Sequence, residues 1–195
     1  MPAGVKYDLN AGEKLSEFCR VETIYRLTGG FNLVIDNLEA GSKIPPMTPL
    51  AIDFATRKAT VVKNVQVVED ATATDTEIKI KKGSQAYIGM ILGTGTKGAA
   101  ISSIDKSSPN YDVLTIAAAF GEAVKKGDAL FEASAAGGTT VKNKANFLNY
   151  AWTKVEPGAA VDAIGQVFEI RESRLVTPIS DKDRATLKGF FIFVP

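Results

Sequence analysis

Short segments rich in β-branched and aromatic residues recur along this chain, and glycine, proline, asparagine and aspartate separate them at intervals of roughly 8–12 residues. Residues 77–82 alternate strictly, which should place Ile78 and Ile80 on one face of a strand. Residues 190–194 read as a final, buried strand. The pattern predicts a mainly β fold, a sandwich or barrel of many short antiparallel strands.

Other segments are predicted from the same pattern. Residues 21–27 are rich in β-branched and aromatic side chains, and residues 59–68 carry enough valines for one long strand. Residues 134–140 are all small, so we expect a mobile loop there. In the first ten residues, Val5, Tyr7 and Leu9 alternate with polar neighbours, which predicts a further strand.

One short helix is expected near the C-terminus, from Ser180 to Lys188. Ser180 is suited to cap its N-terminus, and Asp181 and Asp183 favour the positive end of the helix dipole. Gly189 should stop it.

The length of 195 residues fits one large domain or two small ones. We expect an N-terminal arm with strands over 1–40 and a β domain over 41–135. A C-terminal β segment over 136–195 should carry the short helix and pack on the same core. The order of the strands within the sheets is not fixed by the sequence.

The composition disfavours several function classes. The chain has no histidine, which removes the commonest general base and a common metal ligand, so we expect no catalytic, cofactor-binding or metal-binding residue. With 23 basic and 22 acidic residues the net charge is +1, whereas nucleic-acid binders usually show a basic excess. No run of about 20 apolar residues and no signal-peptide pattern is present, so no membrane contact is expected.

Two motifs invite a functional interpretation. Gly93-Thr-Gly-Thr-Lys-Gly98 matches G-x-G-x-x-G after an apolar strand, but the residues that follow alternate like a strand. A dinucleotide site needs a helix there, so a glycine-rich hairpin is favoured. Cys19, the only cysteine, should pack as a small apolar group rather than act as a nucleophile.

Aromatic residues supply the best ligand candidates. Tyr150 and Trp152 are separated by one residue, which would place both rings on one strand face as a possible platform for a sugar. Core or subunit packing is the competing interpretation for each ring. Acidic residues are scattered, and paired carboxylates would do hydrolytic chemistry only if the fold brought two of them together.

Three stretches together resemble the head-fibre, or capsid-decoration, proteins of tailed bacteriophages. They are Gly41-Ser-Lys-Ile-Pro-Pro-Met-Thr-Pro-Leu-Ala-Ile-Asp-Phe-Ala-Thr-Arg-Lys-Ala59, then Ile78-Lys-Ile-Lys-Lys-Gly83 leading into Tyr87-Ile-Gly89, and the blocks from Ile101 to Phe131. The resemblance implies a non-enzymatic virion component, commonly a homotrimer, attached to the outer capsid. It supplies no catalytic residues.

The leading hypothesis is therefore a structural protein, of phage or prophage origin, that is made in the bacterial cytoplasm and decorates the capsid exterior. Its expected partners are further copies of itself, as a trimer in the family's manner, and the major capsid protein, with a host surface glycan as a further candidate. The proline-rich entry is the predicted interface, formed by Ile44, Pro45, Pro46, Met47 and Pro49. The alternatives are a carbohydrate- or receptor-binding β module and a carboxylate-based hydrolase.

Overall fold

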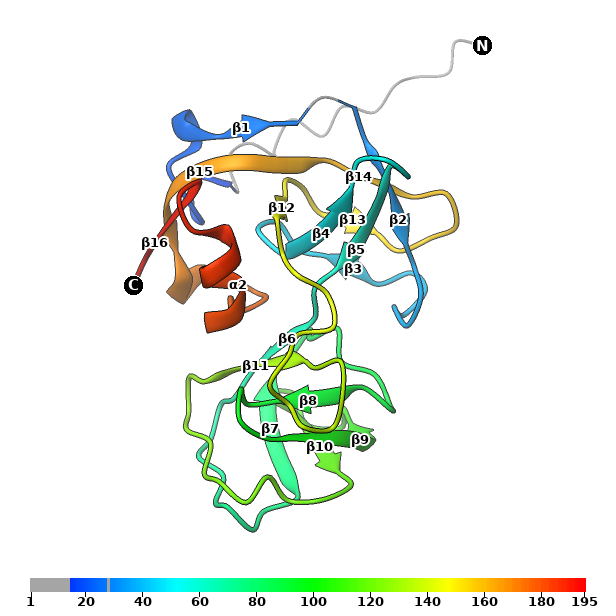
Figure 1. Cartoon of the computed structure of the whole chain (residues 1–195), viewed down its shortest axis with the longest axis vertical. Coiled ribbons are helices and arrows are strands. Elements are labelled where there is room, and N and C mark those ends of the chain that lie inside the picture. The colour runs from blue at the N-terminus through cyan, green and yellow to red at the C-terminus, as the bar shows by residue number, and fades with distance from the viewer. Residues whose placement is uncertain (1–14, 28) are drawn as a thin grey trace.

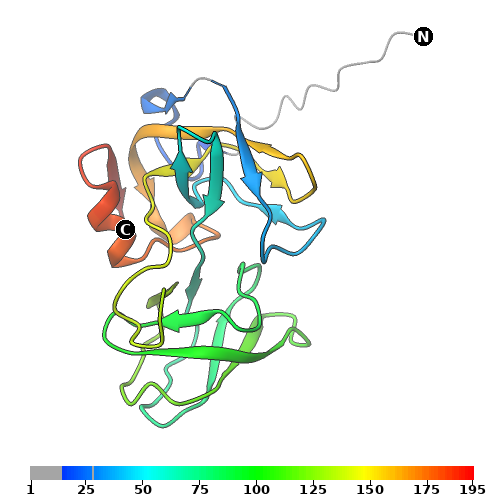
Figure 2. The same ribbon diagram turned by 45° about the vertical axis from the view of Figure 1, so that its right-hand side comes forward.

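The computed structural model describes residues 15–27 and 29–195, which form two lobes (Figure 1). The larger lobe contains both ends of the described chain, and the smaller lobe is made from its middle. Figure 2 shows the chain crossing between the two lobes. The fold is mainly β and sandwich-like, as predicted, with several sheets and a single short α-helix in the described part.

The larger lobe is built on an eight-stranded sheet in the order β1-β15-β12-β4-β5-β2-β14, with β16 paired to β15, and on the small pair β13-β3. The pairs are antiparallel except β2 with β5 and β15 with β16. Its strands are β1 (Tyr25–Arg26), β2 (Phe31–Val34), β3 (Lys43–Ile44), β4 (Pro49–Asp53), β5 (Lys58–Val61), β12 (Phe147–Asn149), β13 (Thr153–Lys154), β14 (Ala160–Val161), β15 (Ala163–Arg171) and β16 (Phe191–Val194).

The smaller lobe is a six-stranded antiparallel sheet in the order β6-β11-β8-β9-β10-β7. Ile78 and Ile80 are both buried on one face of β7, which confirms the alternation. The sheet curls until Val67, just after β6, bridges to Ile80, but no full ladder closes it. Its strands are β6 (Asn64–Gln66), β7 (Glu77–Lys81), β8 (Ile91–Gly93), β9 (Gly98–Asp105), β10 (Tyr111–Ile116) and β11 (Ala129–Glu132).

The predicted helix is present as α2 (Asp181–Leu187). Ser180 accepts a hydrogen bond from the Asp183 amide, and the Asp183 side chain bonds back to the Ser180 amide, which completes a capping box. Two 3-10 turns lie beside the long strand β15. η1 (Val21–Thr23) contacts β15 in space, and η2 (Glu172–Arg174) follows it directly in the sequence.

The predicted strand over 21–27 is only partly correct, because its first half is η1 and β1 is only two residues long. The Thr23 hydroxyl donates to the Arg20 carbonyl at 2.7 Å and accepts from the Phe168 amide at 3.0 Å. Such local side-chain bonds compete with strand pairing. The strand predicted around Val5, Tyr7 and Leu9 lies outside the described residues.

The single long strand predicted over 59–68 is wrong. β5 belongs to the larger lobe and β6 to the smaller one, and Val62 and Lys63 cross between them. Lys63, the only charged residue of 59–68, lies at that crossing. The chain returns through residues 133–146, between β11 and β12. Sheet pairing therefore joins strands from all three predicted segments, since β2 pairs with both β5 and β14.

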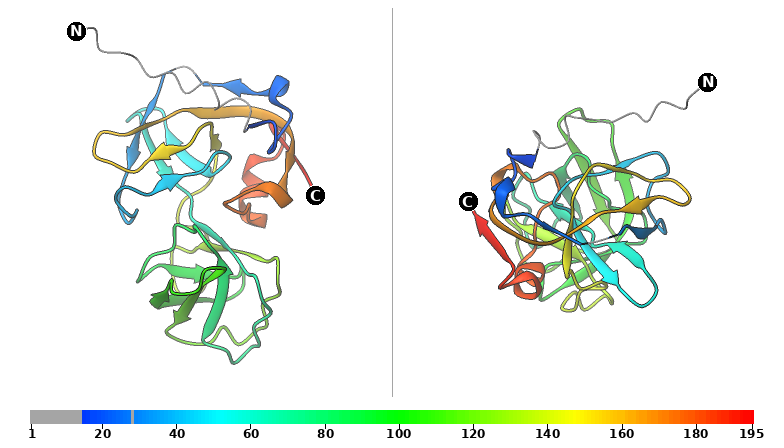
Figure 3. Two further views of the ribbon diagram at one scale, coloured as in Figure 1. Left: turned by 180° about the vertical axis from the view of Figure 1, so that it is seen from behind. Right: turned by 90° about the horizontal axis from the view of Figure 1, so that it is seen from above.

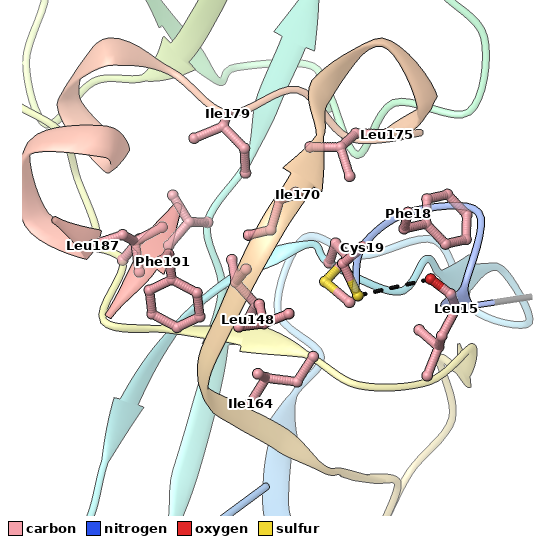
Figure 4. Packing of buried hydrophobic residues seen from close by; sticks show 14 residues of the cluster. Leu15, Phe18, Cys19, Leu148, Ile164, Ile170, Leu175, Ile179, Leu187 and Phe191 are labelled. Atoms are coloured by element: carbon pink, nitrogen blue, oxygen red, sulfur yellow. Dashed lines mark hydrogen bonds between the residues drawn. The ribbon is translucent and has the colours of Figure 1, made fainter. Parts of the chain in front are cut away.

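Each lobe has its own apolar interior. In the larger lobe, Figure 4 shows side chains from the N-terminal turn, β15, α2 and β16 converging around Cys19. A second cluster in that lobe centres on Phe31, Leu50 and Val61. The smaller lobe is filled by Ile78, Leu92 and their neighbours. No helix within the described ranges is long and apolar enough to cross a membrane.

Candidate functional site

The predicted aromatic platform is not on a strand. Tyr150 and Trp152 lie in the link between β12 and β13, so the prediction that they share a strand face is wrong. The reason is local: Asn149 donates to the Ala151 carbonyl at 2.6 Å, which turns the chain at the end of β12. Tyr150 is half-buried, with the Arg26 guanidinium 4.0 Å from its ring centroid, while Trp152 is 46% exposed.

The proline-rich entry is packed inside the larger lobe. All five residues predicted there as an interface, Ile44, Pro45, Pro46, Met47 and Pro49, are buried. The segment is held from within, because the Met47 amide donates to the Asn149 carbonyl at 2.7 Å and Asn149 donates to Pro45 at 2.9 Å. This placement assigns the five residues to the core of the lobe and not to an exposed contact surface.

Large apolar side chains are exposed elsewhere on the larger lobe. Tyr25 is 63% exposed on β1, Phe190 is 63% exposed in the turn before β16, and Ile192 is 50% exposed on β16. Tyr25 pairs with Gln166, and the neighbouring pair Val167–Phe191 points into the core. Because side chains alternate along strands, Tyr25 and Ile192 point away from that core, and Phe190 is exposed in the turn before β16. We call Tyr25, Phe190 and Ile192 the outer apolar face.

The position of the outer apolar face bears on what it can contact. β1 and much of β15 cross the end of the larger lobe farthest from the smaller lobe, whereas β16 lies on the side of the lobe beside α2 (Figure 3). The Tyr25 ring lies over Gly165, where a Cβ would come within 3.3 Å of it. Exposed apolar side chains gathered on one face are typical of protein–protein contact surfaces. The buried strand predicted over 190–194 is only partly correct, because β16 begins at Phe191 and both Phe190 and Ile192 are exposed.

A buried polar cluster lies at the junction of the lobes. Glu132, on β11, accepts hydrogen bonds from Tyr87 at 2.5 Å and from Lys142 at 2.8 Å, and its second oxygen lies 3.9 Å from the Lys63 ammonium. The side chains of Lys63 and Glu132 are only 5% and 3% exposed. Lys63 and Lys142 come from the two crossings between the lobes, so the carboxylate ties both crossings to the smaller lobe.

The protonation of this cluster follows from its burial. Desolvation lowers the pKa of Lys63, and the opposite charge of Glu132 offsets only part of that effect. Hydrogen bonds to Glu132 and Tyr87 raise the pKa of Lys142, which is more exposed. Burial, followed by the hydrogen bond to Glu132, raises the pKa of Tyr87. The cluster thus holds the junction through one doubly bonded Glu132 oxygen, while the second oxygen faces Lys63 without a hydrogen bond. Sequence reasoning missed it, although Lys63 is the only charged residue of 59–68.

The glycine-rich motif is a hairpin, as predicted. Gly93 at the end of β8 pairs with Gly98 at the start of β9. Glu122 accepts hydrogen bonds from Thr94 and from Thr96 across this hairpin, and these bonds lower its pKa. The Gly138 carbonyl accepts from the Gly95 amide at 3.1 Å, which packs the loop 134–140 on the hairpin. The glycines therefore allow two backbones to approach closely.

Acidic side chains gather at one place: Glu69, Asp70, Asp75 and Glu77 line a pocket of about 400 Å³ in the smaller lobe. Within residues 15–27 and 29–195, no three histidine, cysteine, aspartate or glutamate side chains come together as a metal site would require. Cys19 is 2% exposed in the core, and burial raises the pKa of its thiol to about 11. The thiol therefore stays protonated near neutral pH, which disfavours nucleophilic chemistry.

Comparison with known proteins identifies the family. The family model described as head fiber protein matches residues 3–195. No curated protein and no solved structure gave a significant match. The match covers nearly the whole chain, and it agrees with the resemblance drawn from residues 41–131. The chain belongs to the phage head fiber protein family, and it is a structural phage protein and a virion component.

Proposed function

We propose that this protein decorates the outside of a phage capsid through protein–protein contacts, as a homo-oligomer and in the first instance a trimer. Membership of the head fiber family supports a structural role on the phage head. The net charge is only +1, so the proposal does not rely on a long-range charge attraction between the protein and the capsid. The proposal gives it no catalytic role.

The single observation that carries the proposal is the outer apolar face. Tyr25, Phe190 and Ile192 would each hold much of a large side chain in water if the protein acted alone. Covering them against a capsid subunit or a second copy removes that apolar area from water. The sheet also has edges at β1 and β16 that such a partner would cover.

Capsid binding tests the proposal directly. Purified protein is mixed with capsids from a phage of the same type that lacks the head fiber, and binding is followed by co-sedimentation. The unchanged protein should sediment with the capsids, and Ile192→Asp combined with Phe190→Ser should lose binding while staying folded by circular dichroism. Ile88→Ser, which changes an exposed apolar side chain on the smaller lobe, is the matched control and should bind normally.

The oligomeric state is measured alongside, by size-exclusion chromatography with light scattering. A trimer predicts a mass about three times 20.7 kDa. If the double variant becomes monomeric, the outer apolar face joins subunits; if it stays trimeric and loses the capsid, the face contacts the capsid. Failure of the unchanged protein to bind such capsids would contradict the proposal.

A further inference from the structure

A groove of about 650 Å³ lies between the two lobes. One wall is the turn and strand start at 37–43 of the larger lobe, and the other is formed by residues 82–88 with Ile104, Lys106 and Asp112 of the smaller lobe. Small-molecule sites usually occupy about 300–1,000 Å³ and are often found where two structural units meet. The size and position of the groove are therefore those of a ligand site.

Gln85 gives the groove an unused hydrogen-bonding group. Its side chain is only 9% exposed, yet it forms no hydrogen bond with any residue of the described chain. Its amide atoms are not among the polar atoms sealed from solvent, and Gln85 is one of the residues that line the groove. A side-chain amide offers two donors and an acceptor, and a mostly buried one is costly unless it is paired.

Apolar side chains flank this amide. Ile88, on the same wall, is 66% exposed, the most exposed large apolar residue in the described chain. Leu38 on the opposite wall and Ile104 beside Ile88 are half-buried in the groove. The groove thus combines a polar group that can both donate and accept with apolar surface on each side.

Four of the five charged side chains in the groove are paired with one another, and Lys43 has no ion pair with the described residues. Lys82 pairs with Asp112 at 2.7 Å, and Lys106 pairs with Glu39 at 2.9 Å. The second pair joins the two walls, so the groove exists before any ligand arrives. A strongly charged ligand would have to break these pairs, which favours an uncharged one.

We propose that this groove binds an uncharged saccharide of one or two rings. A sugar presents hydroxyls that both donate and accept, as the Gln85 amide requires, and C–H faces that fit against Ile88 and Leu38. The groove suits an extended peptide less well, because such a peptide usually pairs with a free strand edge. Here the walls are turns and strand ends, and β9 and β10 are already paired on both sides. The site is distinct from the link that carries Tyr150 and Trp152.

Saturation-transfer NMR on the full chain tests this, with glucose, galactose, their N-acetylated amino sugars and the corresponding disaccharides as probes. At least one probe should receive saturation, and its affinity is then measured by titration. Gln85→Leu should weaken that affinity about tenfold or more, because the sugar hydroxyls lose their buried partner. Gln166→Leu, which changes a glutamine on the outward side of β15, is the matched control and should leave it unchanged.

Ile88→Ser provides a second variant at an exposed position, where folding is not at risk, and it should weaken binding about threefold or more through lost apolar contact. The proposal is overturned if no probe receives saturation, or if the bound sugar is unaffected by both groove variants. It is equally overturned if Trp152→Ala abolishes binding while Gln85→Leu does not, or if short peptides bind the groove in place of sugars. Capsid binding by these variants is expected to be normal, so failure here is separable from failure of the capsid proposal.

Discussion

Asn64, in the first strand of the smaller lobe, donates a hydrogen bond of 2.6 Å to Asp183 in helix α2 of the larger lobe. The same amide donates to the Pro178 carbonyl at 2.9 Å. The receiving oxygen of Asp183 also accepts from the hydroxyl and the amide of Ser180. One buried carboxylate therefore closes the helix cap and joins the lobes, although 119 residues separate it from Asn64.

Removing the Asn64 amide should weaken this joint. Asn64→Ala leaves a nearly fully buried carboxylate with one donor fewer, and a lost buried partner costs about 1–3 kcal/mol. Urea unfolding followed by circular dichroism measures the loss. Asn32→Ala, at an exposed position on β2, should change stability by no more than about 0.5 kcal/mol. Equal effects of the two variants would show that the joint between the lobes contributes nothing.

The buried carboxylate of Glu132 should contribute more to the stability of the fold than an exposed carboxylate does. Glu132→Gln removes the counter-charge of the buried Lys63 and of Lys142, and breaking a buried ion pair on one side typically costs about 3–5 kcal/mol. Glu69→Gln makes the same chemical change in an exposed pair with Lys79, where about 0–1 kcal/mol is expected.

The comparison is made by thermal unfolding of both variants at one pH and salt concentration. Lys63→Met should restore part of the stability lost in Glu132→Gln, because it removes the charge left without a partner. A double variant no more stable than Glu132→Gln alone would contradict the buried-charge explanation.

The elements that depend on local pattern were predictable from the sequence. The alternation around Ile78 and Ile80, the capping residues of α2 and the hairpin at Gly93–Gly98 all rest on residues close together in the chain. These patterns can be recognised in the sequence because the interactions behind them join residues that are close together in the chain. The family, too, was identified from the order of local blocks.

What depends on distant pairing was not predictable. Phe147 pairs with Leu50 across 97 positions of the chain, and this pairing buries the proline-rich entry that was predicted as an interface. An apolar run looks the same whether it packs inside a lobe or against another subunit. Gln85 and Lys63 gave no motif, since their importance comes from what the fold places around them.

Gly138 should be far less tolerant of substitution than its neighbour. In Gly138→Ala the new Cβ would overlap the Lys97 carbonyl, and a φ of +65° adds a penalty of roughly 1–2 kcal/mol by itself. At Gly137 no heavy atom lies within 4 Å and φ is not positive, so Gly137→Ala should be neutral or stabilise by about 0.4–1 kcal/mol.

Urea unfolding of the two variants checks this, and limited proteolysis reports on the loop itself. Gly138→Ala should make residues 134–140 more readily cleaved, because the loop can no longer pack on the hairpin. Similar cleavage of both variants would mean that the loop is not held there in solution.

The buried thiol of Cys19 should make stability depend on alkaline pH. Burial raises its pKa from the ordinary 9.0 to about 11, so between these values the folded protein holds a proton that the unfolded chain has lost. The free energy of unfolding therefore falls as pH rises through this window. The stability that the protonated thiol contributes is fully present only below about pH 9.

Cys19→Ala lacks the titrating group and serves as the reference. The stability difference between the unchanged protein and Cys19→Ala should be constant below this window and should shift against the unchanged protein within it. A difference that stays constant from pH 9.0 to about 11 would show that the thiol ionises as readily in the folded protein as in the unfolded chain.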